Sequence, residues 1–343
     1  MTGPGPSGPA TVLAVRGLDV AFRVGRGRRA RTVRAVTGAD LDLRAGRLTA
    51  LVGESGCGKS VLTEALTGLL PGTASVRGSA VLTPPAGPRE RSTGHDPVGL
   101  ITAPESVLRD RVRGRLIGLV PQSAATHLTP TRTVGAQLRE TLARLGATAT
   151  VADLLDRAAL PGHVADRYPH ELSGGQAQRA GLAAALAGDP PVLLADEPTA
   201  GLDRPLVDHV TALLAGLAAE GRAVLLITHD LRAARAVADD VAVMYASRLV
   251  ETGPAAEVFT EPWHPYTAGL LAALPDAGFT PVPGHPPELS ALPDGCAFAP
   301  RCPVTADCTG DPAPVHRDGR SVSCHPPTAP ALPATARSGA GSR

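Results

Sequence analysis

Lysine occurs once in this chain, at Lys59, while every other basic side chain apart from histidine is arginine. This lysine lies in a run of the form glycine, four residues, Gly-Lys-Ser, namely Gly53-Glu54-Ser55-Gly56-Cys57-Gly58-Lys59-Ser60. The form is that of a phosphate-binding loop, whose backbone N–H groups point at phosphate oxygens and whose glycines let the backbone come close. A compact ammonium can reach the β- and γ-phosphates, where a planar guanidinium fits poorly. The run therefore predicts a nucleotide phosphate site, with the hydroxyl of Ser60 as a ligand of Mg²⁺.

The residues around the run have the context that a phosphate-binding loop requires. The apolar stretch Leu48 to Val52 predicts a buried strand, and Ser60 to Leu70 predicts a helix, with Gly72 beyond its end. A strand, a loop and a helix N-terminus in this order present backbone donors to an anion. The alternative is a glycine-rich turn that matches the motif by chance. Cys57 is a small filler of the loop or, beside helix N-terminal N–H groups, a reactive thiol.

A second set of residues for the same chemistry ends an apolar stretch from Val192 to Ala195, which is followed by Asp196 and Glu197. A buried strand that ends in unpaired carboxylates is costly unless a cation or a reacting group meets them. Beside a phosphate loop, Asp196 is expected to hold Mg²⁺, and Glu197 to orient and polarise the attacking water as a general base. The alternative is an acidic pair that caps the next helix.

The elements that must position these residues alternate along the chain. Val12 to Val24 and Val33 to Leu43 have the two-residue period of strands, and Thr83 to Pro104 has the composition of an irregular surface excursion. After it, helical patterns alternate with short buried strands, which predicts an α/β fold with a mostly parallel sheet and its ligand at the carboxyl ends of the strands. The expected elements are helices 105–116, 134–145, 151–160, 176–187 and 204–219 and strands 116–120, 191–195 and 223–228.

Composition limits the classes of function. With 343 residues, 43% of them hydrophobic, the chain can bury a core of one large or two ordinary domains. A formal net charge of +1 and an aromatic content of 2% argue against bulk attraction to nucleic acid and against base-stacking platforms. The sequence has neither an apolar stretch that could span a bilayer nor an N-terminal signal core, so we expect it in the cytoplasm. There, five cysteines are expected as free thiols or metal ligands.

The run Leu172-Ser173-Gly174-Gly175-Gln176, followed by Gln178 and Arg179, adds a second candidate anion site. A serine and two glycines that open a helix give an anion-binding N-terminus, although the same residues could be a plain helix cap. The run resembles the signature motif of the ATP-binding subunits of ABC transporters. This resemblance implies that Ser173 to Gln176 serve the ATP of a second ABC ATPase subunit in a head-to-tail dimer.

Three more positions match the same family, and a fourth is a candidate by position. In the family, the residue at Gln122 touches Mg²⁺ and the attacking water and reports to the membrane subunit. The residue at His229 contacts the γ-phosphate, and the loop Thr199 to Asp203 crosses the dimer interface. Phe22 is the candidate for stacking on adenine, with a core aromatic as its alternative. The resemblance thus implies an ATPase with Glu197 as base, assisted by Lys59, Gln122 and His229.

The segment after the ATPase core narrows the resemblance. Glu261-Pro262-Trp263-His264-Pro265-Tyr266-Thr267 is similar to the extension of the oligopeptide, dipeptide and nickel uptake subset of these ATPases. The resemblance implies an importer for di- or oligopeptides, nickel or a related small solute. Its partners would be two membrane permease subunits and, indirectly, an extracytoplasmic solute-binding protein. The alternative is a soluble ABC ATPase that acts on nucleic acid or ribosomes, which the near-neutral charge and the single cassette disfavour.

Four cysteines follow in the extension: Cys296, Cys302, Cys308 and Cys324. Prolines between them force turns, so four thiolates can converge on one metal site. Their spacing is not the paired C-x-x-C of a zinc ribbon. In relatives, similar cysteines are associated with a 4Fe-4S cluster, but here one residue fewer than usual separates Cys302 from Cys308. A cluster, zinc and unligated thiols all stay open.

Together these patterns predict a P-loop ATPase core of RecA-like α/β type with an N-terminal antiparallel β part. We expect the ABC ATPase domain over residues 11–260, with an inserted helical subdomain at about 105–178, and the cysteine-containing extension over 261–325. Residues 1–10 and 326–343 are expected to be disordered, because proline, alanine, glycine and serine dominate there. The expected location is the cytoplasmic face of the cell membrane, as a peripheral subunit with no nucleic acid partner.

Overall fold

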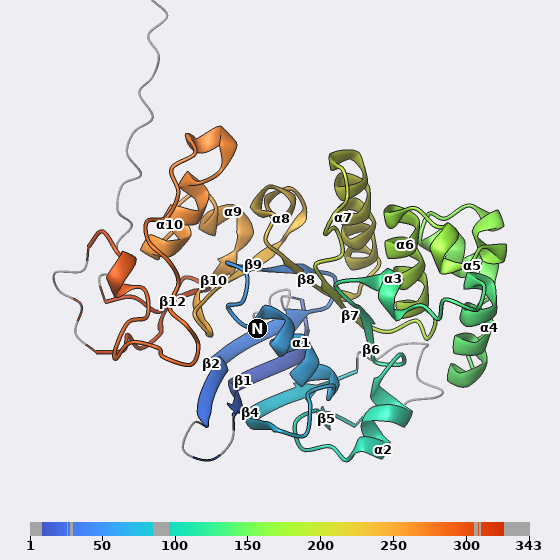
Figure 1. Cartoon of the computed structure of the whole chain (residues 1–343), viewed down its shortest axis with the longest axis horizontal. Coiled ribbons are helices and arrows are strands. Elements are labelled where there is room, and N and C mark those ends of the chain that lie inside the picture. The colour runs from blue at the N-terminus through green and yellow to red at the C-terminus, as the bar shows by residue number, and fades with distance from the viewer. Residues whose placement is uncertain are drawn as a thin grey trace, which may run out of the picture.

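The computed structural model describes residues 9–25, 27, 30–84, 96–304, 308 and 310–325. The predicted disordered tail 326–343 lies outside these residues, and so does the predicted disordered head apart from residues 9 and 10. Two sheets form the framework, with helices packed between and around them (Figure 1). The helices of residues 134–185 and the C-terminal segment lie at opposite ends of the molecule (Figure 1).

The larger sheet has eight strands in the order β11-β12-β10-β9-β3-β8-β7-β6. Five neighbouring strands, β9, β3, β8, β7 and β6, pair in parallel, which confirms the predicted mostly parallel sheet. The strands β3 and β8 are buried on both faces, as expected from their mainly apolar sequences. The strand bounds are β3 Leu48–Val52, β6 Ile117–Val120, β7 Val192–Asp196, β8 Ala223–Thr228, β9 Asp240–Tyr245, β10 Arg248–Pro254, β11 Val315–Arg317 and β12 Arg320–Val322.

The smaller sheet is antiparallel, in the order β2-β1-β4-β5, and confirms the predicted N-terminal β part. In β1 the apolar side chains at alternate positions are buried, so one face of this sheet turns toward the core. The strand bounds are β1 Thr11–Val24, β2 Arg31–Arg44, β4 Ala74–Leu82 and β5 Val98–Gly99.

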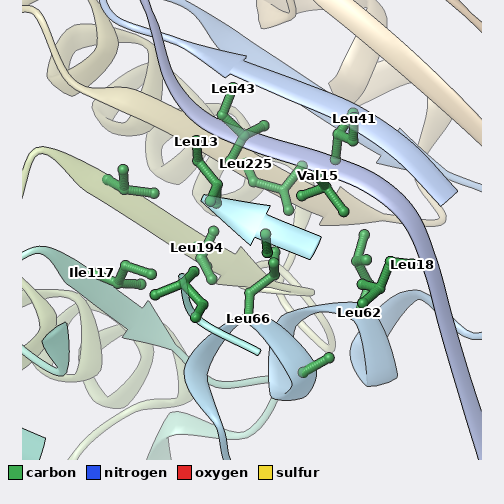
Figure 2. Packing of buried hydrophobic residues seen from close by; sticks show 14 of the residues in the cluster. Leu13, Val15, Leu18, Leu41, Leu43, Leu62, Leu66, Ile117, Leu194 and Leu225 are labelled. Carbon is green, nitrogen blue, oxygen red and sulfur yellow. The ribbon is translucent and has the colours of Figure 1, made fainter. Parts of the chain in front are cut away.

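The helix α1, Lys59–Thr67, packs its apolar face into the space between the two sheets. Figure 2 shows Leu62 and Leu66 of α1 close to Leu18 of β1 and Leu194 of β7. All four side chains are fully buried in one cluster, so the two sheets and α1 share a single core. The helix that follows the glycine-rich loop is therefore anchored on both sides.

A second core lies on the other face of the larger sheet and is built by helices. No helix among the described parts of the chain is long and apolar enough to cross a membrane. Thr133 caps α4, and Thr150 forms a reciprocal capping box with Asp153 at the start of α5. The helix bounds are α2 Glu105–Val107, α3 Ala124–His127, α4 Val134–Leu145, α5 Val151–Arg157, α6 Gly174–Ala185, α7 Arg204–Ala219 and α8 Leu231–Val237.

The C-terminal segment packs directly against the larger sheet. The hairpin β11-β12 extends the sheet through β10, and the rings of Tyr266 and Phe298 pack in one cluster with Tyr245 of β9. The bounds of its helices are α9 Ala255–Val258, α10 Pro265–Ala272, and the short 3-10 helices Pro275–Ala277 and Ala299–Arg301. The extension therefore shares a core with the strands that carry the phosphate loop.

Several predicted boundaries of helices and loops are wrong. The helix after the loop ends at Thr67 because Gly68, in the left-handed region at φ 64°, caps it three residues before the predicted end. The predicted helix 105–116 is instead the short α2 followed by a π-helical turn, Leu108–Val112. The predicted irregular excursion 83–104 contains the edge strand β5.

Candidate functional site

Four of the predicted site segments follow neighbouring parallel strands. The glycine-rich loop follows β3, His229 follows β8, Glu197 follows β7, and Gln122 follows β6. These strands are adjacent in the order β3-β8-β7-β6, so their carboxyl ends lie along one edge of the sheet. This edge is where parallel α/β sheets bind ligands.

Two glycines of the loop lie where no other residue fits. Gly53 has φ 155° and Gly58 has φ 112°, and a Cβ atom would lie 2.1 Å from Met244 O at Gly53 and 1.9 Å from Ala35 O at Gly58. Gly58 is also the N-cap residue that precedes α1, and it offers no side chain to cap the helix. The absence of side chains thus lets the loop pass close to β9 and β2 and leaves its N–H groups for a ligand.

The ammonium of Lys59 lies inside the loop. Its Nζ donates to the carbonyl oxygens of Gly53 at 2.8 Å and Glu54 at 2.9 Å, and the residue is only 5% exposed. A buried ammonium held by two neutral carbonyl oxygens favours the approach of an anion, such as the phosphate oxygens of a nucleotide. Cys57 is buried nearby, and burial raises the pKa of its thiol, so it fits the role of a small filler better than that of a reactive thiol.

Asp196 has the environment of a cation ligand. It is 7% exposed, its pKa is raised mainly by burial, and it is hydrogen-bonded to Ser60. Its Oδ1 is buried without a hydrogen-bond partner. A buried carboxylate with an unused oxygen, next to a serine hydroxyl, is the oxygen-rich donor set that Mg²⁺ takes. The residues present therefore fit the ion.

Gln122 and His229, which lie in two different loops, both approach one carboxylate oxygen of Glu197. Glu197 Oε2 accepts a hydrogen bond from Gln122 Nε2 at 3.2 Å and lies 3.3 Å from His229 Nδ1. Glu197 itself has φ 44°, a conformation that is strained for a residue with a side chain. Its N–H continues the sheet by donating to Ile227 O. A carboxylate that two neighbours hold, on a strained backbone, is well placed to hold and orient a water molecule.

The signature-like run lies apart from this cluster. Ser173 caps α6 and forms a reciprocal capping box with Gln176, while Asp203 caps α7 through the N–H of Leu206. Gly175 packs toward α7, whose Leu206 would lie 2.8 Å from a Cβ atom at Gly175. No hydrogen bond or ion pair between described residues joins this run to the glycine-rich loop or to Glu197.

Phe22 lies on β1, opposite Val33 of β2 and Ala74 of β4. It is partly buried and packs against the core cluster shared by the two sheets. Its predicted role in stacking on adenine stays a prediction, with the core aromatic as the alternative.

The four cysteines of the extension are free thiols, and Cys324 is buried. Burial, followed by the nearby Cys302, Cys296 and Cys308, raises the pKa of Cys324 to about 12. Among the described residues, no group of three or more His, Cys, Asp or Glu side chains is arranged to hold a metal ion. The thiols are therefore neighbours but do not surround a common point.

Sequence reasoning missed two residues at the phosphate loop. Tyr266 of α10 accepts the backbone N–H of Glu54, and Arg301 binds the Glu54 carboxylate. The sequence around Tyr266 indicates only a subset of the family, and nothing in the spacing of Arg301 points to residue 54. Contacts across 212 and 247 residues of chain leave no local pattern in the sequence.

Comparison with known families agrees with this geometry. Residues 36–200 match the family described as ABC transporter, and residues 250–308 match the family described as oligopeptide/dipeptide transporter, C-terminal region. A putative peptide import ATP-binding protein of Brucella ovis is 40% identical over 85% of this chain and 89% of its own length. The chain belongs to the ABC transporter ATPase family.

Further relatives of this ABC ATPase extend the comparison. The dipeptide transport ATP-binding protein DppD of Bacillus subtilis is 38% identical over 91% of this chain and 94% of its own length. Among solved structures, a dimeric ATP-binding cassette in a post-hydrolysis state with ADP and phosphate has a TM-score of 0.58 at 25% identity and covers 71% of this chain and 98% of its own. CbiO1 from Clostridium perfringens, part of an ABC transporter complex, has a TM-score of 0.57 at 26% identity and covers 73% and 91%. This ABC ATPase hydrolyses ATP with Mg²⁺, as its family and the phosphate loop require.

Proposed function

We propose that this chain is the ATP-hydrolysing subunit of an ABC importer that takes up di- or oligopeptides, nickel or a related small solute. The match of residues 250–308 to the oligopeptide/dipeptide transporter C-terminal region supports the importer interpretation. The names of relatives that are about 40% identical, peptide import and dipeptide transport proteins, support peptides as the first solute to test. The observation that carries the ATPase chemistry is the convergence of Gln122 and His229 on Glu197 beside the Lys59 loop.

In the proposed reaction, the loop amides and Lys59 bind the β- and γ-phosphates of ATP. Ser60 and Asp196, with Gln122, would hold Mg²⁺, which neutralises charge on the phosphates. Glu197 accepts a proton from the attacking water, whose oxygen displaces ADP in line at the γ-phosphorus. Gln122 and His229 keep the Glu197 carboxylate in place by the contacts described above. Phe22 would stack on the adenine.

A second ATPase subunit completes the site in this proposal. Ser173, Gly174, Gly175 and Gln176, with Asp203 beside the interface, would serve the ATP on the loop of the partner, head to tail. The separation of the Ser173 run from its own loop supports this arrangement. A related cassette was solved as a dimer. The helix N-terminus at Ser173 offers the donors that an anion needs.

The remaining partners follow from the importer interpretation. Two permease subunits would contact the surface near Gln122, and an extracytoplasmic solute-binding protein would deliver the solute, with no role for nucleic acid. The subunit would sit peripherally on the cytoplasmic face of the membrane. We also propose the division into an ATPase domain, residues 11–260, with a helical subdomain at about 105–178, and an extension over 261–325.

For the four cysteines we propose a 4Fe-4S cluster, with zinc and unligated thiols as the alternatives. Cys296, Cys302 and Cys308 all contribute to the raised pKa of Cys324, so the four thiols belong to one part of the extension, although the described residues are not arranged around a metal ion. Four thiolates are also the donor set that such clusters take. Anaerobic purification with iron, sulfide and zinc analysis separates the three cases. About four irons and four sulfides per chain that are lost in Cys302→Ser would support the cluster.

The ATPase proposal is tested with Glu197→Gln, which removes the base but keeps the size of the side chain. We expect turnover at saturating ATP to fall by about 100-fold or more while ATP is still bound. Glu257→Gln, an exposed carboxylate change on α9, is the matched control and is expected to keep full activity. Full turnover by Glu197→Gln would contradict the assignment of the base.

The import proposal needs the permease partners. In vesicles that contain the reconstituted complex, labelled dipeptide or nickel should accumulate only with ATP, and not with Glu197→Gln. If none of these solutes is taken up and none changes the rate of ATP hydrolysis, the import interpretation is contradicted. The assignment of ATPase activity would still stand.

A further inference from the structure

Two residues of the C-terminal extension, Tyr266 and Arg301, form hydrogen bonds with Glu54 of the phosphate loop. From these contacts we infer that Arg301 and Tyr266 are positioning residues, which hold the loop in its phosphate-binding shape and so raise the affinity of the site for ATP. The inference rests on the proposed role of the loop in binding ATP. It assigns the extension a part in the ATP site that its sequence does not indicate.

The first contact is an ion pair with two parallel hydrogen bonds. Arg301 Nη1 and Nη2 donate to the two carboxylate oxygens of Glu54 at 2.8 and 2.9 Å. The Arg301 side chain is only 4% exposed and its guanidinium also donates to Tyr245 Oη and Pro283 O. The ion pair, as the main cause, raises the pKa of Arg301 above its usual range. Such a bidentate pair fixes both the position and the plane of the carboxylate.

The second contact holds the backbone of the same residue. The N–H of Glu54 donates to Tyr266 Oη at 3.0 Å, and Tyr266 is fully buried. Its ring packs at 4.5 Å between centroids against Tyr245 and at 5.4 Å against Phe298. His264 caps α10 by accepting the backbone N–H of Tyr266. The hydroxyl therefore comes from a rigid support.

The third contact leads from Glu54 to the catalytic lysine. The carbonyl oxygen of Glu54 accepts a hydrogen bond from Lys59 Nζ at 2.9 Å. Glu54 is thus held at its N–H by Tyr266, at its carboxylate by Arg301 and at its carbonyl by Lys59. A displacement of Glu54 would move a direct partner of the lysine. The extension can act on the phosphate site through this one residue.

A purely structural role, in which the pair only attaches the extension to the core, is the competing explanation. Two other arginines make comparable attachments away from the loop. Arg320 pairs with Glu251 in a fully buried site, and Arg248 pairs with Asp311 at the surface. Glu251 also accepts the backbone N–H of His264, which caps α10, so Arg320 is linked to Tyr266. Substitution at Arg248 loosens the extension without touching Glu54 or Tyr266 and serves as the matched control.

The test compares Arg301→Gln, Glu54→Gln and the double variant. Each single change leaves one partly or fully buried charge without its partner, so we expect the KM for ATP to rise about tenfold with kcat within about twofold of the wild type. The double variant should be no worse than either single variant, because both charges are gone. Arg301→Lys, which keeps the charge but not the two parallel bonds, should fall between Arg301→Gln and the wild type. Tyr266→Phe should raise KM by about threefold.

A second readout does not depend on hydrolysis. Because Lys59 is the sole lysine, an amine-directed reagent labels only Lys59 and the N-terminus, which mass spectrometry separates. Without ATP, Lys59 of Arg301→Gln should be labelled about tenfold faster than in the wild type, relative to the N-terminus, because one of its carbonyl partners has been released. Labelling of Lys59 in Arg248→Gln should match the wild type.

Three results would overturn the inference. One is an unchanged KM and labelling rate in folded Arg301→Gln and Arg301→Lys. Another is an equal change in Arg248→Gln, which would indicate general loosening. The third is a change in KM only where metal content has also changed, so metal is measured in every variant. Failure of the proposed function is distinct, because then the wild type itself would bind no ATP or Glu197→Gln would turn over normally.

Discussion

At the scale of single residues, the phosphate loop depends on glycines, because they have no Cβ atom. Gly58 lies against Ala35 O, and Gly53 against Met244 O, at distances that exclude any Cβ atom. Gly46, in the turn before β3, also has positive φ, but a Cβ atom added there would have no neighbour within 4 Å among the described residues. The two kinds of glycine separate the effect of close approach from that of backbone conformation alone.

We predict that Gly58→Ala weakens ATP binding by about 100-fold or more, because the new methyl group displaces the loop. Gly46→Ala should leave ATP binding unchanged and lower the free energy of unfolding by about 1–2 kcal/mol, since it introduces only left-handed strain. Equilibrium binding of a fluorescent ATP analogue and denaturant titration measure both. Equal ATP affinity in the two variants would contradict the role of close approach.

Local sequence patterns are enough to predict site residues whose chemistry is local. The loop pattern identifies Lys59 and Ser60, and an apolar strand that ends in acids identifies Asp196 and Glu197. Such patterns could not reach Arg301, because the contact with Glu54 depends on how the extension packs. The strained φ of 44° at Glu197 is likewise imposed by neighbouring strands, whose pairing no single-strand pattern reveals.

At the scale of elements, α10 is tied to the loop by a capping histidine. His264 is 1% exposed, and its Nδ1 accepts the backbone N–H of Tyr266 at 3.0 Å. Burial lowers the pKa of His264 from 6.5 to about 4, so the folded chain keeps it neutral where the unfolded chain begins to bind a proton. The cap therefore makes the stability of the fold depend on pH.

We predict that His264 makes the free energy of unfolding fall as pH is lowered from about 6.5 to about 4, because the unfolded state binds more protons in that window. The loss should approach about 3 kcal/mol near pH 4 and stop growing below it. His264→Gln keeps an acceptor but cannot titrate, so its stability should depend less on pH. Denaturant titrations from pH 7 to pH 4 measure this, with exposed His163→Gln as control. Parallel pH profiles of wild type and His264→Gln would contradict the prediction.

Helix boundaries show what local sequence can determine. The predicted ranges of α4 and α7 agree with the structure, since Thr133 and Asp203 cap their starts. The sequence predicts that α1 ends at Leu70, because its apolar periodicity continues to that residue. Gly68 instead takes the left-handed cap, where Leu108 would lie 2.5 Å from a Cβ atom. That neighbour comes from a distant segment, so the local sequence does not reveal the choice between Gly68 and Gly72.

At the scale of the whole molecule, the two predicted anion sites are not joined by any hydrogen bond or ion pair among the described residues. The Ser173 run and the Lys59 loop belong to different parts of the fold. If each run forms half of an ATP site, as proposed above, a second cassette would complete it.

We predict that Glu197→Gln dimerises when ATP is added, because ATP that is not hydrolysed holds the two surfaces together. Adding Ser173→Arg to this variant should abolish the dimer while each chain still binds ATP on its own loop. Sedimentation analysis with ATP and with ADP measures the change in mass. A variant Glu197→Gln that binds ATP but stays monomeric would indicate that the second surface comes from a different ATPase subunit.

The distance in sequence between Glu54 and Arg301 also affects how the site forms during translation. Glu54 leaves the ribosome 247 residues before its partner, which is roughly 12 to 50 seconds at about 5–20 residues per second. During that interval the loop and most of the parallel sheet are already available to fold, but Tyr266 and Arg301 are absent. The nascent cassette would thus acquire tight ATP binding only after residue 301 has left the ribosome.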